Sequence, residues 1–234
     1  MTNITVLIYT TKDDQNLKEC LNSAKLLTKN ILLIYPNSKI VETVREEGIK
    51  KAKTDWVLIL DVDERITPEL KKEIKNIFNN NNQKYSAYKI PRKNIFAQKK
   101  WLKYGGWWPD YQIRLINKKY FLSWPKQIHS TPQIIGKIGY LKNPILHYFH
   151  GNLDNMVKKT IIFEDIESDL LYKADKKANT LIFFRKFLAE LYRRILKNLG
   201  FIDGTIGIIE AIYQAFSKTI TYLFLYEKNQ QKNN

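Results

Sequence analysis

Three acidic residues directly follow an apolar run in the first third of the chain. Asp61, Asp63 and Glu64 come after residues 56–60, a Trp-Val-Leu-Ile-Leu run with the length of a buried strand. In an extended segment the carboxylates of Asp61 and Asp63 point the same way, and two such oxygen ligands can hold Mg²⁺ or Mn²⁺ against a diphosphate. A solvated loop that leads into a helix at Thr67 explains the same residues, so the D-x-D triplet by itself is a weak signal.

The elements that must position these acids alternate between strand and helix. Apolar runs predict three strands, and apolar residues at helical spacing predict two helices between them. In chain order these segments are residues 4–9, 17–27, 31–35, 41–52 and 56–60. The alternation favours an α/β fold with a parallel sheet covered on both faces, whose ligands bind beyond the carboxyl ends of the strands.

The rest of the chain changes character twice. Thr67 and Pro68 predict the start of a helix. Two further strands and an irregular, aromatic-rich segment are predicted at residues 85–90, 112–116 and 91–110. From Asp154 onward the pattern is helical and amphipathic. We therefore predict an α/β domain over residues 1–153 and a helical extension over residues 154–234.

Several blocks resemble glycosyltransferase family 2, in particular its branch that adds sugars to lipopolysaccharide cores and related envelope glycans. Residues 53–70, KTDWVLILDVDERITPEL, resemble the family signature around its D-x-D. Residues 104–116, YGGWWPDYQIRLI, resemble G-G-W-x-P-D-x-Q-x-R-L-F. Residues 128–129 resemble the start of V-H-E, residues 144–148 resemble P-L-x-H-Y, and residues 200–207 resemble G-F-x-D-G-x-x-G. Blocks that occur in the family's order are far more specific than any one of them.

The resemblance implies a GT-A-like nucleotide-binding fold and an inverting transfer of a sugar from a nucleotide-diphosphate donor. It places Asp61 and Asp63 at the divalent metal, Mg²⁺ or Mn²⁺, and at the donor diphosphate. It makes Asp110 the candidate general base, because a carboxylate near the acceptor hydroxyl must remove its proton as the anomeric carbon is attacked. A turn after Pro109 is the structural interpretation of the same aspartate.

Other residues in these blocks are candidates for binding. Arg114 can pair with phosphate oxygens in bidentate fashion, and the resemblance places His129 near the metal or the diphosphate. The candidates for contact with the sugar or the acceptor are Trp107, Trp108 and Glu64. For the two tryptophans the reason is that flat aromatic rings stack on sugars. The structural interpretation is a surface salt bridge for Arg114 and a hydrogen-bonded structural role for His129. For Trp107 and Trp108 it is buried packing.

The chain departs from the family pattern before the D-x-D. Residues 35–38, YPNS, stand where the family has D-S-x-S-x-D, and the stretch from there to Asp55 is short by about one helix and strand. In addition, His129 is followed by Ser130 and not by the family's Glu. The N-terminal half of the predicted sheet is therefore shortened. A degenerate fold that acts as a non-catalytic binding or scaffold subunit stays open as the alternative function.

The chain is strongly basic. Its 39 Lys and Arg stand against 23 Asp and Glu, a formal charge of +16, and residues 71–130 hold fourteen basic and two acidic side chains. Such a field attracts nucleotide diphosphates and anionic lipid. Because no recognised nucleic-acid motif accompanies the charge, we expect no specific nucleic-acid binding. The amphipathic terminal helices favour an anionic membrane surface as a partner, and the implied acceptor is a glycolipid or cell-envelope glycan.

Three further observations bound the location and the reaction. The single cysteine, Cys20, cannot form a disulfide within the chain, which fits a reducing compartment. No signal-peptide pattern and no run of eighteen apolar residues occur, so we expect a cytoplasmic protein, peripheral at the inner face of the cell membrane. A haloacid-dehalogenase-type phosphatase also has D-x-D after an apolar strand, but there Gly-Thr follows, where this chain has Glu64 and Arg65. The oligomeric state stays open.

Overall fold

The chain forms two compact units in a computed structural model. The structure describes residues 3–36, 41–79, 84–97, 99–127, 130–149 and 153–231. One unit, here called the sheet unit, comprises Met1–Lys93 and Pro109–Tyr148. The other, the helical unit, comprises Asn94–Trp108 and Phe149–Asn234. The domain division predicted after residue 153 stays a prediction.

The sheet unit begins with the strand and helix alternation that the sequence predicts. Its elements, in chain order, are β1 (Ile4–Tyr9), α1 (Leu17–Lys25), β2 (Ile31–Ile34), α2 (Glu42–Lys51), β3 (Trp56–Asp61), β4 (Glu64–Ile66) and α3 (Pro68–Asn79). They continue with β5 (Ala87–Phe96), β7 (Asp110–Asn117), a 3-10 turn (Lys118–Tyr120), β8 (Phe121–Ser123), β9 (Gln133–Ile134), β10 (Ile138–Tyr140) and β11 (Ile145–Phe149). The α/β class predicted from the sequence is confirmed.

The sheet is mixed. Its first three strands are parallel, and β10 pairs with β5 in parallel as well. β1 lies between β2 and β3 and pairs with both in parallel. β7 pairs with β3 and with β5 in antiparallel fashion, and β11 pairs with β4 in the same way. The strand order is β2-β1-β3-β7-β5-β11-β4. The parallel sheet predicted for the first part of the chain is confirmed over β1, β2 and β3. The pairings of β7 with β3 and β5 are antiparallel.

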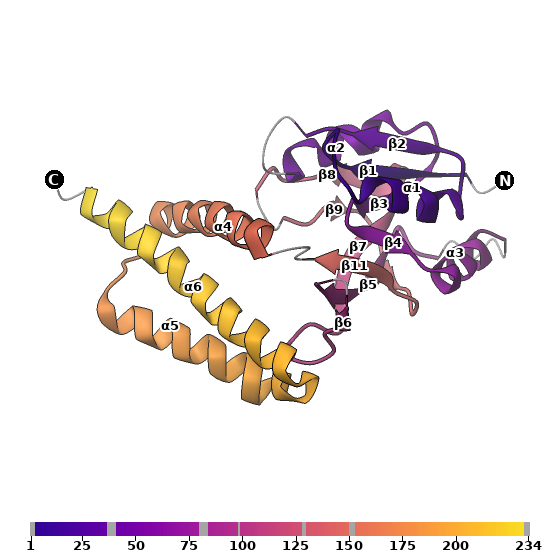
Figure 1. Cartoon of the computed structure of the whole chain (residues 1–234). Coiled ribbons are helices and arrows are strands. Elements are labelled where there is room, and N and C mark those ends of the chain that lie inside the picture. The colour runs from indigo at the N-terminus through magenta and orange to yellow at the C-terminus, as the bar shows by residue number, and fades with distance from the viewer. Residues whose placement is uncertain are drawn as a thin grey trace. The chain divides into compact units, whose positions relative to one another are not determined.

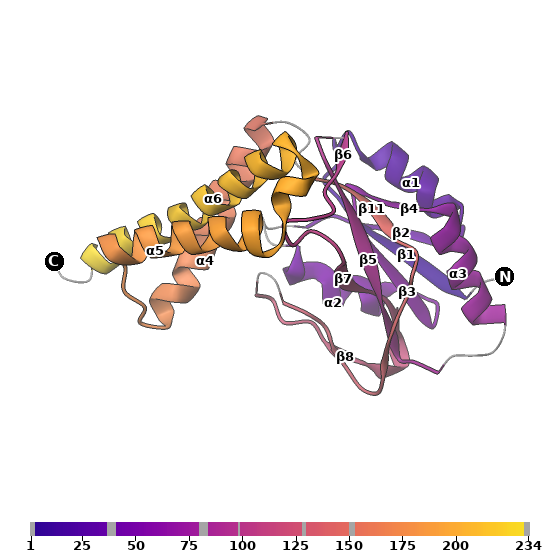
Figure 2. The same ribbon diagram turned by 90° about the horizontal axis from the view of Figure 1, so that it is seen from below.

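Helices cover both faces of the parallel strands. α1 and α3 lie on one face and α2 lies on the other (Figure 2). One apolar cluster joins alternate residues of β1 and β3 to α1 and α3, and the other joins the intervening residues to α2 and Trp124. Strands buried on both faces read as continuous apolar runs, which is why residues 56–60 carry no polar position. Thr67 Oγ1 accepts a hydrogen bond from the Leu70 amide at 3.1 Å, which confirms the predicted start of α3.

The helical unit holds three long helices and an aromatic-rich segment. Its elements are β6 (Lys100–Trp101), α4 (Leu153–Lys173), α5 (Thr180–Tyr192), a π-helical turn (Arg193–Lys197), a 3-10 turn (Gly200–Asp203) and α6 (Thr205–Gln231). Figure 1 shows α6 packed against both α4 and α5. None of the helices in the described ranges is long and apolar enough to cross a membrane. The predicted irregular segment over residues 91–110 contains the end of β5 and the short strand β6.

The block that resembles G-F-x-D-G-x-x-G anchors the aromatic-rich segment. Asp203 belongs to this block, and its Oδ2 accepts hydrogen bonds from the backbone amides of Lys103 and Tyr104 at 2.8 Å each. A Cβ on Gly207 would lie 2.1 Å from the carbonyl oxygen of Gly200, so only glycine permits this close approach of two turns. The block therefore has a structural role within the helical unit.

A buried carboxyl group makes the helical unit sensitive to pH. Glu210 on α6 has no exposed surface, and its Oε1 accepts a hydrogen bond from the Gln214 side chain at 2.8 Å. Burial raises its pKa from 4.5 to about 7, against the opposing effects of Gln214 and Arg194. Because the folded pKa lies above the unfolded value, ionisation opposes folding. The contribution of Glu210 to the free energy of unfolding is therefore full below pH 4.5 and declines as the pH rises towards 7.

Replacing Glu210 with glutamine is expected to flatten this pH dependence. At pH 8 the free energy of unfolding should increase by about 2 kcal/mol relative to the wild type, since the variant does not bury a charge. Urea unfolding at pH 5 and pH 8 measures the effect. Glu227→Gln, at an exposed position of the same helix, serves as the matched control and should keep the wild-type slope. Equal slopes for Glu210→Gln and the wild type would contradict this account.

Candidate functional site

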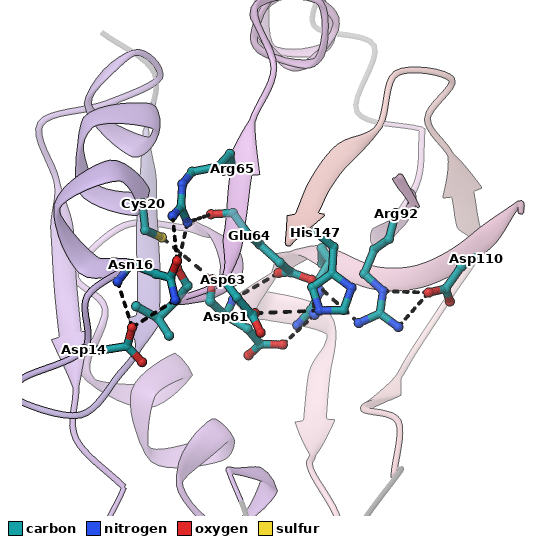
Figure 3. Close-up of polar contacts among 12 residues, drawn as sticks. Asp14, Asn16, Cys20, Asp61, Asp63, Glu64, Arg65, Arg92, Asp110 and His147 are labelled. Atoms are coloured by element: carbon teal, nitrogen blue, oxygen red, sulfur yellow. Dashed lines mark hydrogen bonds and ion pairs between the residues drawn. The ribbon is translucent and has the colours of Figure 1, made fainter. Parts of the chain in front are cut away.

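Six side chains of alternating charge form one continuous row in the sheet unit. We call it the charged row. It comes from α2, the end of β3, β4, β5 and β7, and its members in order of contact are Arg45, Asp61, Arg114, Glu64, Arg92 and Asp110. Figure 3 labels four of these residues, Asp61, Glu64, Arg92 and Asp110. Because three guanidinium groups face three carboxylates, the row is balanced internally despite its burial. Three of the predicted site residues besides Asp61 thus lie in one row with it.

Asp61 is held between two arginines. It ends β3 beside Tyr9, the last residue of β1. Its Oδ1 accepts from Arg45 Nη2 at 2.9 Å and its Oδ2 accepts from Arg114 Nη2 at 2.7 Å. Burial alone would raise the pKa of Asp61, but the two guanidinium groups outweigh it and hold the pKa well below its usual range. The side chain is therefore an ionised anchor for two arginines.

Arg45 was not predicted, and it lies under two aromatic rings. Its guanidinium carbon is 5.0 Å from the centre of the Tyr9 ring and 5.2 Å from that of Trp124. The residue is 6% exposed, and its Nε and Nη1 make no hydrogen bond to any residue that the structure describes. Buried guanidinium donors of this kind are costly unless an anion meets them. The α2 arginine is thus equipped to meet an oxyanion close to Asp61.

Glu64 connects the two ends of the row. It has no exposed surface, and its Oε1 accepts from Arg114 Nη2 at 2.6 Å while its Oε2 accepts from the Asp61 amide at 3.0 Å. On the other side its Oε1 lies 3.8 Å from Arg92 Nη1. These contacts leave Glu64 no surface with which to touch an acceptor sugar directly. They make it a residue that positions Asp61 and Arg114.

The turn between β3 and β4 is fixed by side-chain contacts to its backbone. Arg65 Nη1 donates to the carbonyl oxygens of Val62 at 2.7 Å and Glu64 at 2.9 Å. Cys20 packs beneath with its Sγ 3.7 Å from the Asp61 carbonyl oxygen, and burial raises the pKa of its thiol to about 12. The neutral thiol is a packing group. The D-x-D is therefore presented on a rigid turn, which suits a ligand-binding role.

Asp110, the predicted base, lies at the other end of the row. It begins β7, and its Oδ2 accepts from Arg92 Nη2 at 2.6 Å and from Arg92 Nε at 2.8 Å. Its Oδ1 accepts from Gln112 Nε2 at 2.8 Å. The carboxylate side chain is 20% exposed. A partly exposed carboxylate that is oriented by a guanidinium can accept a proton from a hydroxyl group that reaches it.

Asp63 lies outside the row and beside a histidine that was not assigned a role. Its Oδ1 is 3.7 Å from Nε2 of His147 on β11, and both side chains are partly exposed. In the described ranges no three His, Cys, Asp or Glu side chains gather into a metal site of their own. One carboxylate and one imidazole, completed by diphosphate oxygens, nevertheless suit a divalent cation such as Mn²⁺. The residues present therefore fit a metal shared with a phosphorylated ligand better than a preformed one.

The remaining predicted residues are not part of the charged row. Trp107 and Trp108 belong to the helical unit. The centre of the Trp107 ring is 4.9 Å from that of Phe149 and 5.1 Å from the guanidinium carbon of Arg194. The rings of Trp108 and Trp101 meet edge-on with their centres 5.4 Å apart. The predicted sugar contact of both tryptophans stays a prediction. His129 lies outside the described residues.

Comparisons with known proteins point to one family. Residues 13–133 match the family described as Glycosyl transferase family 2. A relative in Rickettsia typhi is 26% identical over 100% of this chain and 90% of its own length, and one in Rickettsia conorii is 24% identical over 99% and 92%. Both are called uncharacterized glycosyltransferases. Among solved structures, S. aureus TarS 1-349 in complex with UDP-GlcNAc superposes with a TM-score of 0.45 and 13% identity, covering 98% of this chain and 92% of that one.

Proposed function

The chain belongs to glycosyl transferase family 2 and is a glycosyltransferase, and from this premise we propose that it moves a sugar from a nucleotide-diphosphate donor to a glycolipid or cell-envelope glycan with inversion at the anomeric carbon. The observation that carries the proposal is the charged row. It connects a diphosphate-type site around Asp61 to a partly exposed carboxylate, Asp110, through a fixed set of ion pairs. Direct displacement needs both a site for the leaving group and a base, each held in place.

The donor diphosphate would bind at the Asp61 end of the row. Arg45 presents two buried donors there, and Arg114 Nη2 is already shared between Asp61 and Glu64. Asp63, with His147 beside it, would hold the divalent metal together with phosphate oxygens. When bound, the metal supplies positive charge that stabilises the departing diphosphate. The arginines supply charge of the same sign from the protein, so the leaving group would meet cations on both sides.

The acceptor hydroxyl would bind at the Asp110 end. Arg92 occupies one carboxylate oxygen and Gln112 the other, which fixes the plane of the carboxylate. The proton of the acceptor hydroxyl would pass to Asp110 as its oxygen attacks the anomeric carbon from the face opposite the diphosphate. Such a single displacement inverts the configuration. Glu64 would act through its contacts to Asp61 and Arg114, and Trp107 and Trp108 remain the proposed contacts to the acceptor sugar.

We further propose that the protein works at the inner face of the cell membrane, as a peripheral protein, because its acceptor carries a lipid or lies in the envelope. The charge of +16 supports attraction to anionic lipid. The acceptor end of the reaction would then occur where the lipid-linked glycan is available.

Nucleotide binding tests the donor half of this proposal. Calorimetry with a panel of nucleoside diphosphates, with and without Mn²⁺ or Mg²⁺, should show binding that the metal strengthens by about tenfold or more in the wild type. Asp63→Asn should remove the metal dependence but keep the weaker binding that the arginines provide. Glu69→Gln, which removes an exposed carboxylate on α3, is the matched control and should behave as the wild type.

The same experiment separates the two functions considered. If folded wild-type protein binds no nucleoside diphosphate, the proposed catalytic function is wrong. The function as a non-catalytic binding or scaffold subunit is then favoured. Metal-dependent binding that Asp63→Asn retains in full would overturn the proposed metal ligand while keeping the donor site. The preferred base would also narrow the identity of the donor.

A further inference from the structure

The outer face of α5 and α6 is apolar over most of its length. On α5 the exposed apolar side chains recur every three or four residues. On α6 a second stripe of exposed apolar side chains is separate from Tyr213, Ser217 and Thr221, which hydrogen-bond to α4. Together the stripes comprise Leu181, Phe184, Leu188, Tyr192 and Leu196 on α5 and its extension, and Ile208, Ile209, Ile212, Phe216, Leu223 and Tyr226 on α6. Leu181 is 77% exposed and Phe184 is 64% exposed. Contiguous apolar surface of this extent marks an interaction site.

A groove runs between the two helices within this apolar surface. It has a volume of about 570 Å³, which lies in the range of pockets that hold small ligands. Four phenylalanines line it together with other uncharged side chains; the lining is Thr180, Phe183, Phe184, Phe187, Phe216, Thr219, Leu223 and Tyr226. The lining contains no charged side chain. A ligand in the groove must therefore be largely hydrocarbon, since a polar ligand would lose its hydration without gaining partners.

Basic side chains border the apolar surface on α5 and just beyond it. Arg185, Arg193 and Lys197 are exposed. The acid on this helix, Glu190, is paired to Arg193 and Arg194 through its two carboxylate oxygens. Because the basic side chains of this segment outnumber its one acid, Glu190, the apolar side chains lie beside net positive charge, a combination that binds anionic lipid surfaces. A second copy of this chain is disfavoured as the occupant because it would bring the same cations towards each other.

We propose that this face of the helical unit docks on an anionic phospholipid leaflet and that the α5–α6 groove takes up one hydrocarbon chain of a membrane lipid. The inference deepens the proposed function, on which it rests for the presence of a lipid-linked acceptor. The phenylalanines would lie at the level of the acyl chains, and Arg185, Arg193 and Lys197 would lie at the level of the headgroups. The groove adds depth to an otherwise flat contact, so a hydrocarbon chain bound within it would slow the release of the protein from the membrane.

Vesicle sedimentation tests the docking face. The full chain should bind vesicles of phosphatidylcholine with about one third phosphatidylglycerol, and bind phosphatidylcholine alone far more weakly. Phe216→Asp/Leu223→Asp should lower the partition coefficient by about tenfold or more, because it places charge on the inserted surface. The matched control, Leu122→Asp/Ile135→Asp, changes two equally exposed apolar residues of the sheet unit and should bind as the wild type. Thermal melting verifies that both double variants remain folded.

Photo-crosslinking tests the groove itself. A phospholipid with a diazirine in its acyl chain should label peptides of α5 and α6, and Thr219→Trp, which fills the groove, should reduce that labelling severalfold while vesicle binding persists. Labelling outside α5 and α6 would overturn the groove assignment. Light scattering that reveals a dimer lost in Phe216→Asp/Leu223→Asp, without vesicle binding by the wild type, would overturn the lipid assignment in favour of a second copy.

The readouts of this inference are independent of the donor site. Vesicle binding and lipid labelling need no nucleotide, so a protein that binds no nucleoside diphosphate but behaves as described here would refute the proposed transfer and not the lipid face. Conversely, normal nucleotide binding with no preference for anionic vesicles would refute the lipid face alone.

Discussion

Asp110→Asn is expected to lower kcat for sugar transfer by about a thousandfold while leaving the affinity for the nucleoside diphosphate unchanged. Asparagine keeps the shape of the side chain and an oxygen for Arg92, but it cannot accept a proton from the acceptor hydroxyl. The loss should therefore fall on the chemical step. Transfer is measured as nucleoside diphosphate released from the best-binding nucleotide sugar in the presence of envelope lipid extract.

A second substitution separates base catalysis from positioning. Gln112→Leu removes the hydrogen bond to Asp110 Oδ1 but keeps the carboxylate and its pair with Arg92. We expect it to lower kcat by only about tenfold. If Asp110→Asn and Gln112→Leu reduce kcat equally, or if Asp110→Asn retains more than a tenth of the wild-type rate, Asp110 is not the base.

Arg114→Met is expected to lower the free energy of unfolding by about 3–5 kcal/mol, a typical cost of removing one partner from a buried ion pair. The Arg114 side chain is 5% exposed and contacts Asp61 and Glu64 at 2.7 and 2.6 Å. Burial by itself would lower the pKa of Arg114, but the two carboxylates outweigh it and raise the pKa further above its usual value. Methionine fills a similar volume, so the loss should come from charge. Urea unfolding at pH 7 measures it.

Two further variants test whether the uncompensated charge of Glu64 causes the loss. Arg92→Met removes a guanidinium from the same row at a position that is 21% exposed, and we expect it to cost about 1 kcal/mol. Adding Glu64→Gln to Arg114→Met should recover part of the stability, because the buried carboxylate is then neutral. A loss below about 1 kcal/mol for Arg114→Met would mean that water reaches the row freely.

The residues that the sequence placed correctly are those with a local signature. The run over residues 56–60 predicted a buried strand, and Asp61 stands at its end as the pattern requires. Arg114 and Asp110 lie on one strand and came from one block. That Arg114 reaches Asp61 and Glu64 depends on β7 pairing with β3 in antiparallel fashion. A pairing between segments more than fifty residues apart leaves no local pattern.

The missed residues differ in the signals they offered. Arg45 lies at helical spacing among Val41, Val44, Gly48 and Ile49, so its place on an apolar face of α2 was readable as a buried cation. His147 lay within the block that resembles P-L-x-H-Y, but that block pointed to no contact with Asp63. Its partner Asp63 is 84 residues away, and β4, which pairs with β11, was too short to be recognised as a strand. The shortened stretch before Asp55 still forms β2 and α2, so the three parallel strands are complete.

The path of the chain between its two units also bears on how such an enzyme could evolve. The chain passes from one unit to the other at residues 93–94, 108–109 and 148–149, and the amides of Lys103 and Tyr104 depend on Asp203, a hundred residues later. A gene exchange with a single breakpoint near residue 150 would join aromatic-rich segments and helices of different ancestry. Their inheritance is thereby coupled, so these segments would change more readily by gradual substitution than by the exchange of whole modules.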